Sequence, residues 1–277
     1  MNRRRLLASA AWAPLVAVPA AAGAQAPLQL GVLPHVSPRV LLVNYQPLRS
    51  HLEKAVERPV EIATAANFRD YHARAVAGNF EVAITAANLG RVSLIDGTLV
   101  GSAIFEPSIP GLLVMLKDRP VVDVEELRGR LLALSNPASL VALKGLAWLR
   151  ERRLSAGTDF RTVHAANEDS LGQLLRSGEA PLAMMSAGEF KAVPEGLRDQ
   201  LAILTEFAQV PGFMVMQKPG GDPDLAARIR HALMGFMATE DGRQFTRLTG
   251  TRTIRAIRPD DLRLLDDVVD ETRRLLA

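Results

Sequence analysis

The sequence predicts an α/β protein made of two lobes with a hinged cleft between them. Short apolar runs rich in β-branched residues alternate with helical segments, which is the pattern of α/β proteins. A charged break, Lys-Asp-Arg-Pro at residues 117–120, divides this alternation into two sets, and strands followed by helices close the chain. Because elements of the first set return after the second set, the chain must cross twice between two lobes.

The first set of elements extends to residue 116. Ser37 and Pro38 form a helix start, because serine caps a helix N-terminus and proline suits the first helical position. Gly78 ends a second helix. We predict strands at 28–33, 60–65, 80–85, 99–104 and 112–116, and helices at 38–57, 67–77 and 87–95.

The second set begins after the charged break. Gly129 and Gly178 end two of its helices, and leucines line one side of the helix at 139–152. We predict helices at 123–127, 139–152, 169–176, 223–239, 242–248 and 260–275, and strands at 130–134, 160–165, 180–185, 201–206 and 213–217. With crossings near 116–118 and 206–213, lobe 1 comprises residues 25–116 and 208–277, and lobe 2 comprises residues 117–207.

Residues 1–24 have the order of an export signal. Three arginines at 3–5 precede an uncharged alanine-rich run, and Ala-Gly-Ala at 22–24 provides the small residues of a cleavage site. The run is short for a membrane span and contains Pro14 and Pro19, which disfavours a retained anchor. The arginines also resemble a twin-arginine signal, and both export routes stay open. We expect a periplasmic protein from which this signal has been cleaved.

Charge and cysteine content exclude several classes of function. The chain has 33 Lys and Arg against 30 Asp and Glu, and the first 24 residues hold three of the arginines and no acid. The remainder is therefore balanced at 30 of each, which predicts no nucleic-acid partner. The absence of cysteine excludes disulfides, thiolate nucleophiles and cysteine-ligated metals.

Candidate ligand residues follow predicted strands, because ligands of open α/β sheets lie outside the strand C-termini, where helices begin. Thr85 and Asn88 lie at one such turn of the first lobe, and Ser135 and Ser139 lie at one of the second lobe. Hydroxyl and amide groups there suit a polar or anionic ligand, but the same residue types also cap helices. Both roles are compatible for each residue.

Three further residues are candidates for ligand contact, and each could instead have a purely structural role. Glu168 precedes a helix, where the helix dipole favours an acid; facing the cleft, it would repel an anion, as would Glu106. His35 follows the first strand and could donate a hydrogen bond to a ligand or serve only structurally. Ser186 ends the strand at 180–185 and could face the cleft.

Catalytic and metal-binding signatures are missing from the sequence. It contains no G-x-S-x-G, H-E-x-x-H or phosphate-binding glycine loop with lysine, and its five histidines lack metal-ligand spacing. We therefore expect no catalytic residues, no metal and no cofactor.

Several short motifs resemble phosphonate-type periplasmic binding proteins, which serve ABC importers. Their order and spacing carry the resemblance over most of the chain: LGVLP at 30–34, QPL at 46–48 with LEK at 52–54, RPV at 58–60, AGNFEVA at 77–83 and EELRGR at 125–130. The resemblance implies a type II periplasmic binding protein fold and an extracytoplasmic, monomeric receptor for a small solute. An ABC permease is the implied membrane partner.

The family's ligand residues match only in part. Its serine- and threonine-rich turn reads Ser-Asn-Pro-Ala-Ser at 135–139, where the resemblance favours Ser139 as a ligand contact. Glu168 stands near the place of the family's histidine, and Pro181 near that of its aspartate. The resemblance implies a small polar or anionic ligand, phosphonate- or phosphate-like by family, but does not fix its identity.

Two other functions remain open. The same fold could report ligand occupancy to a membrane receptor kinase. An exported enzyme is the second alternative, although relatives of the fold in pyrimidine biosynthesis rely on cysteine and histidine clusters, and this chain has no cysteine.

Overall fold

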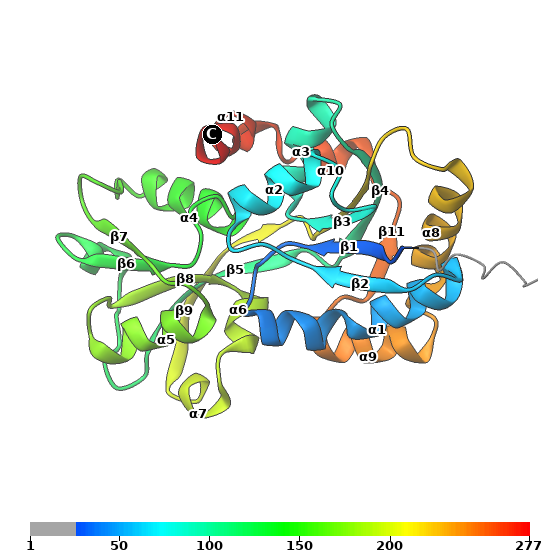
Figure 1. The fold of residues 1–277 in the computed structure, drawn as a ribbon. Helices are drawn as coiled ribbons and strands as arrows, with labels where there is room; N and C mark the ends of the chain where they lie inside the picture. The colour runs from blue at the N-terminus through cyan, green and yellow to red at the C-terminus, as the bar shows by residue number, and fades with distance from the viewer. Residues whose placement is uncertain (1–25) are drawn as a thin grey trace, which may run out of the picture.

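Two β-sheets organise residues 26–277, which are the residues that the computed structural model describes (Figure 1). The expected export signal at 1–24 lies outside this range. Each sheet is mixed, and each is covered by helices on both faces. Each forms the centre of one lobe, and the two lobes lie end to end in Figure 1.

The sheet of the first lobe has six strands in the order β11-β4-β10-β3-β1-β2. β1 pairs parallel with β2 and β3 at one end of the sheet, and β10 and β11 pair antiparallel with their neighbours. The strands are β1 (Leu28–Val32), β2 (Val60–Ala63), β3 (Val82–Thr85), β4 (Val100–Glu106), β10 (Met214–Gln217) and β11 (Thr253–Arg255).

Helices cover both faces of this sheet. On one face α1 (Pro38–Val56) packs against α8 (Pro223–Phe236) and α9 (Glu240–Thr249), and its buried Leu41, Leu48 and Leu52 recur at helical spacing. On the other face lie α2 (Phe68–Val76), α3 (Ala87–Ile95) and α11 (Val269–Leu276), which contact one another (Figure 1).

The sheet of the second lobe has five strands in the order β7-β6-β8-β5-β9. Parallel pairing joins β6 to β7 and β8, and β5 pairs antiparallel with β8 and β9. The strands are β5 (Ile109–Leu116), β6 (Leu131–Leu134), β7 (Arg161–His164), β8 (Leu182–Ser186) and β9 (Leu201–Val210). The helical segments are η1 (Val124–Leu127), α4 (Leu140–Glu151), α5 (Glu168–Ser177), α6 (Ala187–Ala192) and α7 (Glu195–Arg198).

The chain passes between the sheets at two places. The first crossing is Pro107–Ser108, between β4 and β5, and the second is Pro211–Phe213, between β9 and β10. The second lies in the expected region, but the first precedes it. Residues 109–116 and 208–210 therefore belong to the sheet of the second lobe, which corrects the expected boundaries. The apolar run of β5 suits either sheet, and the charged break at 117–120 is only a turn after it.

The other differences are local. The expected single helix at 260–275 consists of α10 (Pro259–Arg263), the short η2 (Asp266–Val268) and α11. The helices α6 and α7 and the strand β11 were not predicted, because each is only three to six residues long. Of these, α6 contributes to the candidate site.

Candidate ligand-binding site

A cavity of about 740 Å³ lies between the two lobes. The first lobe lines it with the loop after β1 and the start of α3, and the second lobe lines it with the loops after β6 and β8. Both crossings between the lobes also border it. The strand C-termini of both sheets thus meet at one site, as expected for facing α/β sheets.

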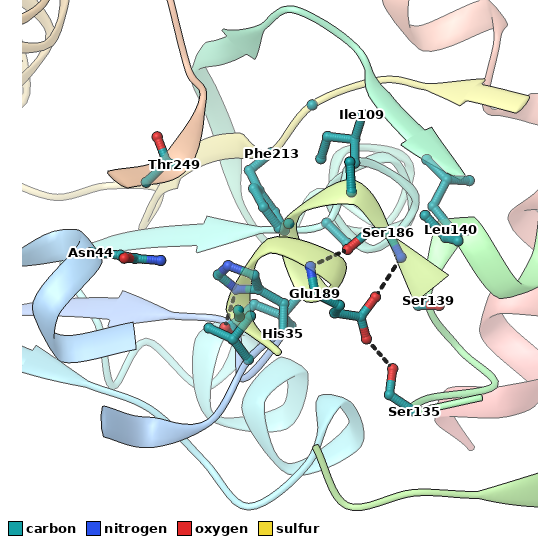
Figure 2. Close-up of a pocket in the computed structure, with 18 of the residues that line it drawn as sticks. His35, Asn44, Ile109, Ser135, Ser139, Leu140, Ser186, Glu189, Phe213 and Thr249 are labelled. Atoms are coloured by element: carbon teal, nitrogen blue, oxygen red, sulfur yellow. Dashed lines mark hydrogen bonds between the residues drawn. The ribbon is translucent and has the colours of Figure 1, made fainter. Parts of the chain in front are cut away.

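Glu189 is the acidic side chain in this wall, among the described residues that line the cavity. It belongs to α6 and is 8% exposed. One carboxylate oxygen accepts a hydrogen bond from the Ser135 hydroxyl, and the other accepts one from the backbone N–H of Ser186 at 2.7 Å (Figure 2). Burial raises the pKa of Glu189, the hydrogen bonds from Ser135 and Ser186 oppose this rise, and the charge of Glu168 adds to it.

Ser186 and Glu189 form a capping box at the start of α6. The Ser186 hydroxyl accepts from the backbone N–H of Glu189 at 3.1 Å, while Glu189 returns to the Ser186 backbone. The S-x-x-E spacing at 186–189 is a sequence signal that could have revealed both the helix and Glu189. The sequence reasoning placed Ser186 at the cleft but missed Glu189.

His35 lies in the cavity wall as a neutral side chain (Figure 2). Its Nδ1 is 2.8 Å from the carbonyl oxygen of Leu33, which can only accept, so Nδ1 carries the proton. Burial lowers the pKa of His35 to about 4, against the opposing effects of the Leu33 carbonyl and of Glu168. At neutral pH Nε2 is therefore an acceptor, whereas the sequence suggested that His35 donates to the ligand.

Ser135 and Ser139 also line the cavity. The Ser139 hydroxyl accepts from the backbone N–H of Ala142 at 3.1 Å and so caps α4. Its own proton takes no part in that bond. Ser139 therefore caps a helix and lines the cavity at the same time.

Thr85 and Asn88 are buried and are not among the residues that line the cavity. Asn88 donates hydrogen bonds from Nδ2 to the carbonyl oxygen of Ala138 at 3.0 Å and to the hydroxyl of Thr272 at 3.1 Å. Ala138 belongs to the second lobe, so Asn88 joins the lobes. The structure thus brings His35, Ser135, Ser139 and Ser186 together and leaves Thr85 and Asn88 behind the wall.

Glu168 is 3% exposed and also lies outside the set of lining residues. Its two carboxylate oxygens accept from the backbone N–H of Ser37 at 2.9 Å and from the Ser37 hydroxyl at 2.6 Å. Ser37 occupies the N-cap position of α1 in the first lobe but makes no side-chain capping hydrogen bond there, and Glu168 begins α5 in the second. Glu106, the other acid considered from the sequence, pairs with Arg255 at 2.7 Å.

Two lysines of the second lobe add further contacts between the lobes. Lys191 donates to the carbonyl oxygen of Leu248 at 3.0 Å, and Lys144 pairs with Asp267 at 2.7 Å. A buried apolar cluster also contains residues of both lobes, among them Leu33 and Leu140. The lobes are therefore in direct contact around the cavity.

Aromatic side chains form much of the remaining wall. The ring centroid of Phe213 lies 4.5 Å from that of His35, and Tyr45 meets His35 edge-on at 5.9 Å. Phe105 and Phe68 line the cavity as well. Tyr45 packs against Phe245 and also borders the cavity.

Within residues 26–277, no three His, Asp or Glu side chains gather in a way that could hold a metal ion. None of the helices in this part of the chain combines the length and apolar character needed to cross a bilayer.

Three of the solved structures with similar folds illustrate the likeness. A binding-protein component of an ABC phosphonate transporter from Pseudomonas aeruginosa has a TM-score of 0.76 at 13% identity, covering 91% of this chain and 89% of that one. PhnD1 from Prochlorococcus marinus, solved with methylphosphonate, has a TM-score of 0.76 at 10% identity, covering 89% and 98%. A Xanthomonas citri protein bound to chloride ion has a TM-score of 0.68 at 18% identity, covering 90% and 98%. No match was found among the curated proteins.

These similarities confirm the expected type II periplasmic binding protein fold. Residues 30–262 match the model of a single family, described as the phosphonate periplasmic substrate-binding protein of ABC transporters. The match includes both lobes and every residue discussed above as lining the cavity. The chain therefore belongs to the phosphonate-type family of periplasmic solute-binding proteins of ABC transporters.

Proposed function

We propose that this protein is the extracytoplasmic receptor of an ABC importer and that it holds a small polar solute in the cavity between its lobes. The observation that carries the proposal is the position of this cavity, which polar side chains of both lobes enclose at the strand C-termini. A ligand there touches both lobes only when they approach one another. It therefore stabilises the closed form by contacts that the open form lacks.

The polar contacts come from separate elements. His35 of the first lobe supplies an acceptor, and Ser135, Ser139 and Ser186 of the second lobe supply hydroxyl groups. We propose these four as ligand contacts and add Glu189. Thr85, Asn88 and Glu168 then support the wall and the contact between the lobes.

The first test is native mass spectrometry of the protein purified without denaturation. Retained solute is expected as an added mass that disappears on denaturation. Rebinding of the released compound should raise the melting temperature, because a ligand at 100 times its Kd stabilises the folded state by about 2.7 kcal/mol. Recovery of the compound chemically unchanged after long incubation supports a receptor, whereas a converted product would indicate an enzyme.

An ABC permease is the proposed membrane partner because the matching family serves ABC transporters. Adjoining genes for a permease and an ATPase would support this partner, and an adjoining histidine kinase gene would favour the sensory alternative. We further propose that the receptor acts as a monomer. Light scattering should give the mass of one chain.

A further inference from the structure

The charge of the cavity wall determines which class of solute the cavity can bind. Glu189 is buried there, and its hydrogen-bond partners are the neutral groups of Ser135 and Ser186. A buried carboxylate is costly without a cation. Burial raises the pKa of Glu189, because the charged carboxylate is less well stabilised away from water.

The groups nearest to Glu189 do not offset this charge. Glu168 is a second carboxylate, close enough to raise the pKa of both Glu189 and His35. His35 is neutral, and its Nδ1 proton is already donated to Leu33. The other ring nitrogen, Nε2, accepts hydrogen bonds, so His35 also suits a ligand that donates one.

The basic side chains that border the cavity lie at its mouth. Lys191 and Arg247 are exposed, and Lys191 donates to backbone carbonyl oxygens at the end of α9. Arg247 lies 3.5 Å from Glu240. Neither is buried beside Glu189, so the described residues that line the cavity include no buried cation that could pair with a doubly charged phosphonate.

Aromatic rings complete the pattern. Phe105, Phe213 and Tyr45 line the cavity together with Glu189. Aromatic faces attract cations, and a desolvated contact of this kind contributes about 2 kcal/mol. A carboxylate and several rings in one cavity form a site for a cation with an apolar body.

We propose that the cavity binds an organic ammonium compound whose charged nitrogen faces Glu189 and whose apolar body lies along Phe213. A cavity of about 740 Å³ has room for a body much larger than methyl. The inference rests on the receptor function proposed above. It departs from the phosphonate that the family description names.

Three probes with one shared body test the ligand class without any substitution. They are 2-phenylethylamine, 2-phenylethanol and 2-phenylethylphosphonate, titrated into the full exported protein after removal of retained solute. The amine should bind at least about tenfold more tightly than the alcohol, as a charged hydrogen bond allows. The phosphonate should bind most weakly. Tightest binding by the phosphonate or the alcohol, or no binding by the amine, overturns the proposal.

Glu189→Gln then tests the named residue, because it removes the charge and keeps the shape. Amine affinity should fall about tenfold or more while alcohol affinity stays within about twofold. Asp169→Asn is the matched control, since it removes an exposed acid outside the cavity wall. Equal amine affinity in Glu189→Gln and the parent protein overturns the role of Glu189.

The two proposals fail differently. An anionic or uncharged solute recovered by native mass spectrometry leaves the receptor function standing and overturns the ammonium ligand. Absence of retained solute, together with no melting shift from a broad metabolite panel, removes both.

Discussion

Glu168 of the second lobe accepts two hydrogen bonds from Ser37 of the first lobe, one from its backbone N–H and one from its hydroxyl. The two residues are 131 positions apart in the chain. The acceptor is a carboxylate, and hydrogen bonds to charged groups are the stronger ones. These two hydrogen bonds connect the start of α1 to the start of α5.

Replacing Glu168 by alanine should loosen the contact between the lobes. We expect the free energy of unfolding to fall by about 1.5–3 kcal/mol, because the partly buried donors of Ser37 lose a charged acceptor. Small-angle scattering of the ligand-free variant should show a larger radius of gyration. Asp169→Ala, at the exposed neighbouring position, is the control. Identical scattering curves for Glu168→Ala and the parent would rule out this role.

Ser139→Ala should weaken ligand binding beyond the loss of a helix cap. Capping by serine contributes about 1 kcal/mol to stability. Asn167 caps α5 in the same way, with Ser170 as its donor at 2.9 Å, but does not line the cavity. We expect similar melting temperatures for Ser139→Ala and Asn167→Ala and at least about tenfold weaker binding of the retained solute in the former. Calorimetry showing equal affinities would remove Ser139 from the site.

His35 should make the protein less stable as the pH falls below about 6.5. Its pKa is about 4 in the folded protein against 6.5 when unfolded, so the unfolded chain binds a proton first. Stability therefore rises with pH through this window, by about 1.4 kcal/mol per unit where the two states differ by a full proton. Urea unfolding at pH 7 and pH 5 measures the difference. His35→Asn should flatten this dependence, and an unchanged slope would contradict it.

Gly212→Ala should disturb the second crossing. A Cβ atom there would lie 2.2 Å from the backbone carbonyl oxygen of Phe105 in β4, so the second crossing or the end of β4 must move. We expect a loss of about 1–3 kcal/mol, as for other overpacked sites, and a lower melting temperature. Gly196→Ala is the control, because nothing lies within 4 Å of its added methyl group.

An exported chain lacking residues 1–24 is expected from the sequence. N-terminal sequencing of the protein recovered from the periplasm should begin at Gln25. A first residue of Met1 in the exported protein would contradict the proposed cleavage.

The strands and helices of the core could be predicted, because their apolar periodicity and their capping residues are local. The strand with which a given strand pairs in a sheet is often far away in the sequence, so local patterns do not reveal it. The run at 112–116 reads the same in either sheet, and only its pairing with β8 and β9 places it in the second lobe. The same limit applies to Asn88, whose position after a strand suggested a ligand contact. Its amide instead reaches Ala138 across the contact between the lobes.

Among the residues predicted as ligand contacts, the capping serines at strand ends line the cavity, and their contact with a ligand stays a prediction. Ser139 and Ser186 border the cavity as expected. Glu189 was missed because the six residues of α6 are too few for a periodic pattern to emerge. Its capping-box spacing was the available signal.

The short length of α6 also places a residue of the cavity wall close to a residue that contacts the other lobe. Glu189, in the cavity wall, and Lys191, which holds the end of α9 in the opposite lobe, are two residues apart on one rigid turn. In the proposed receptor, a solute that displaces the Glu189 carboxylate would also displace Lys191 and so change the contact between α6 and α9. The proposed membrane partner would then sense occupancy of the cavity as a change at its outer rim.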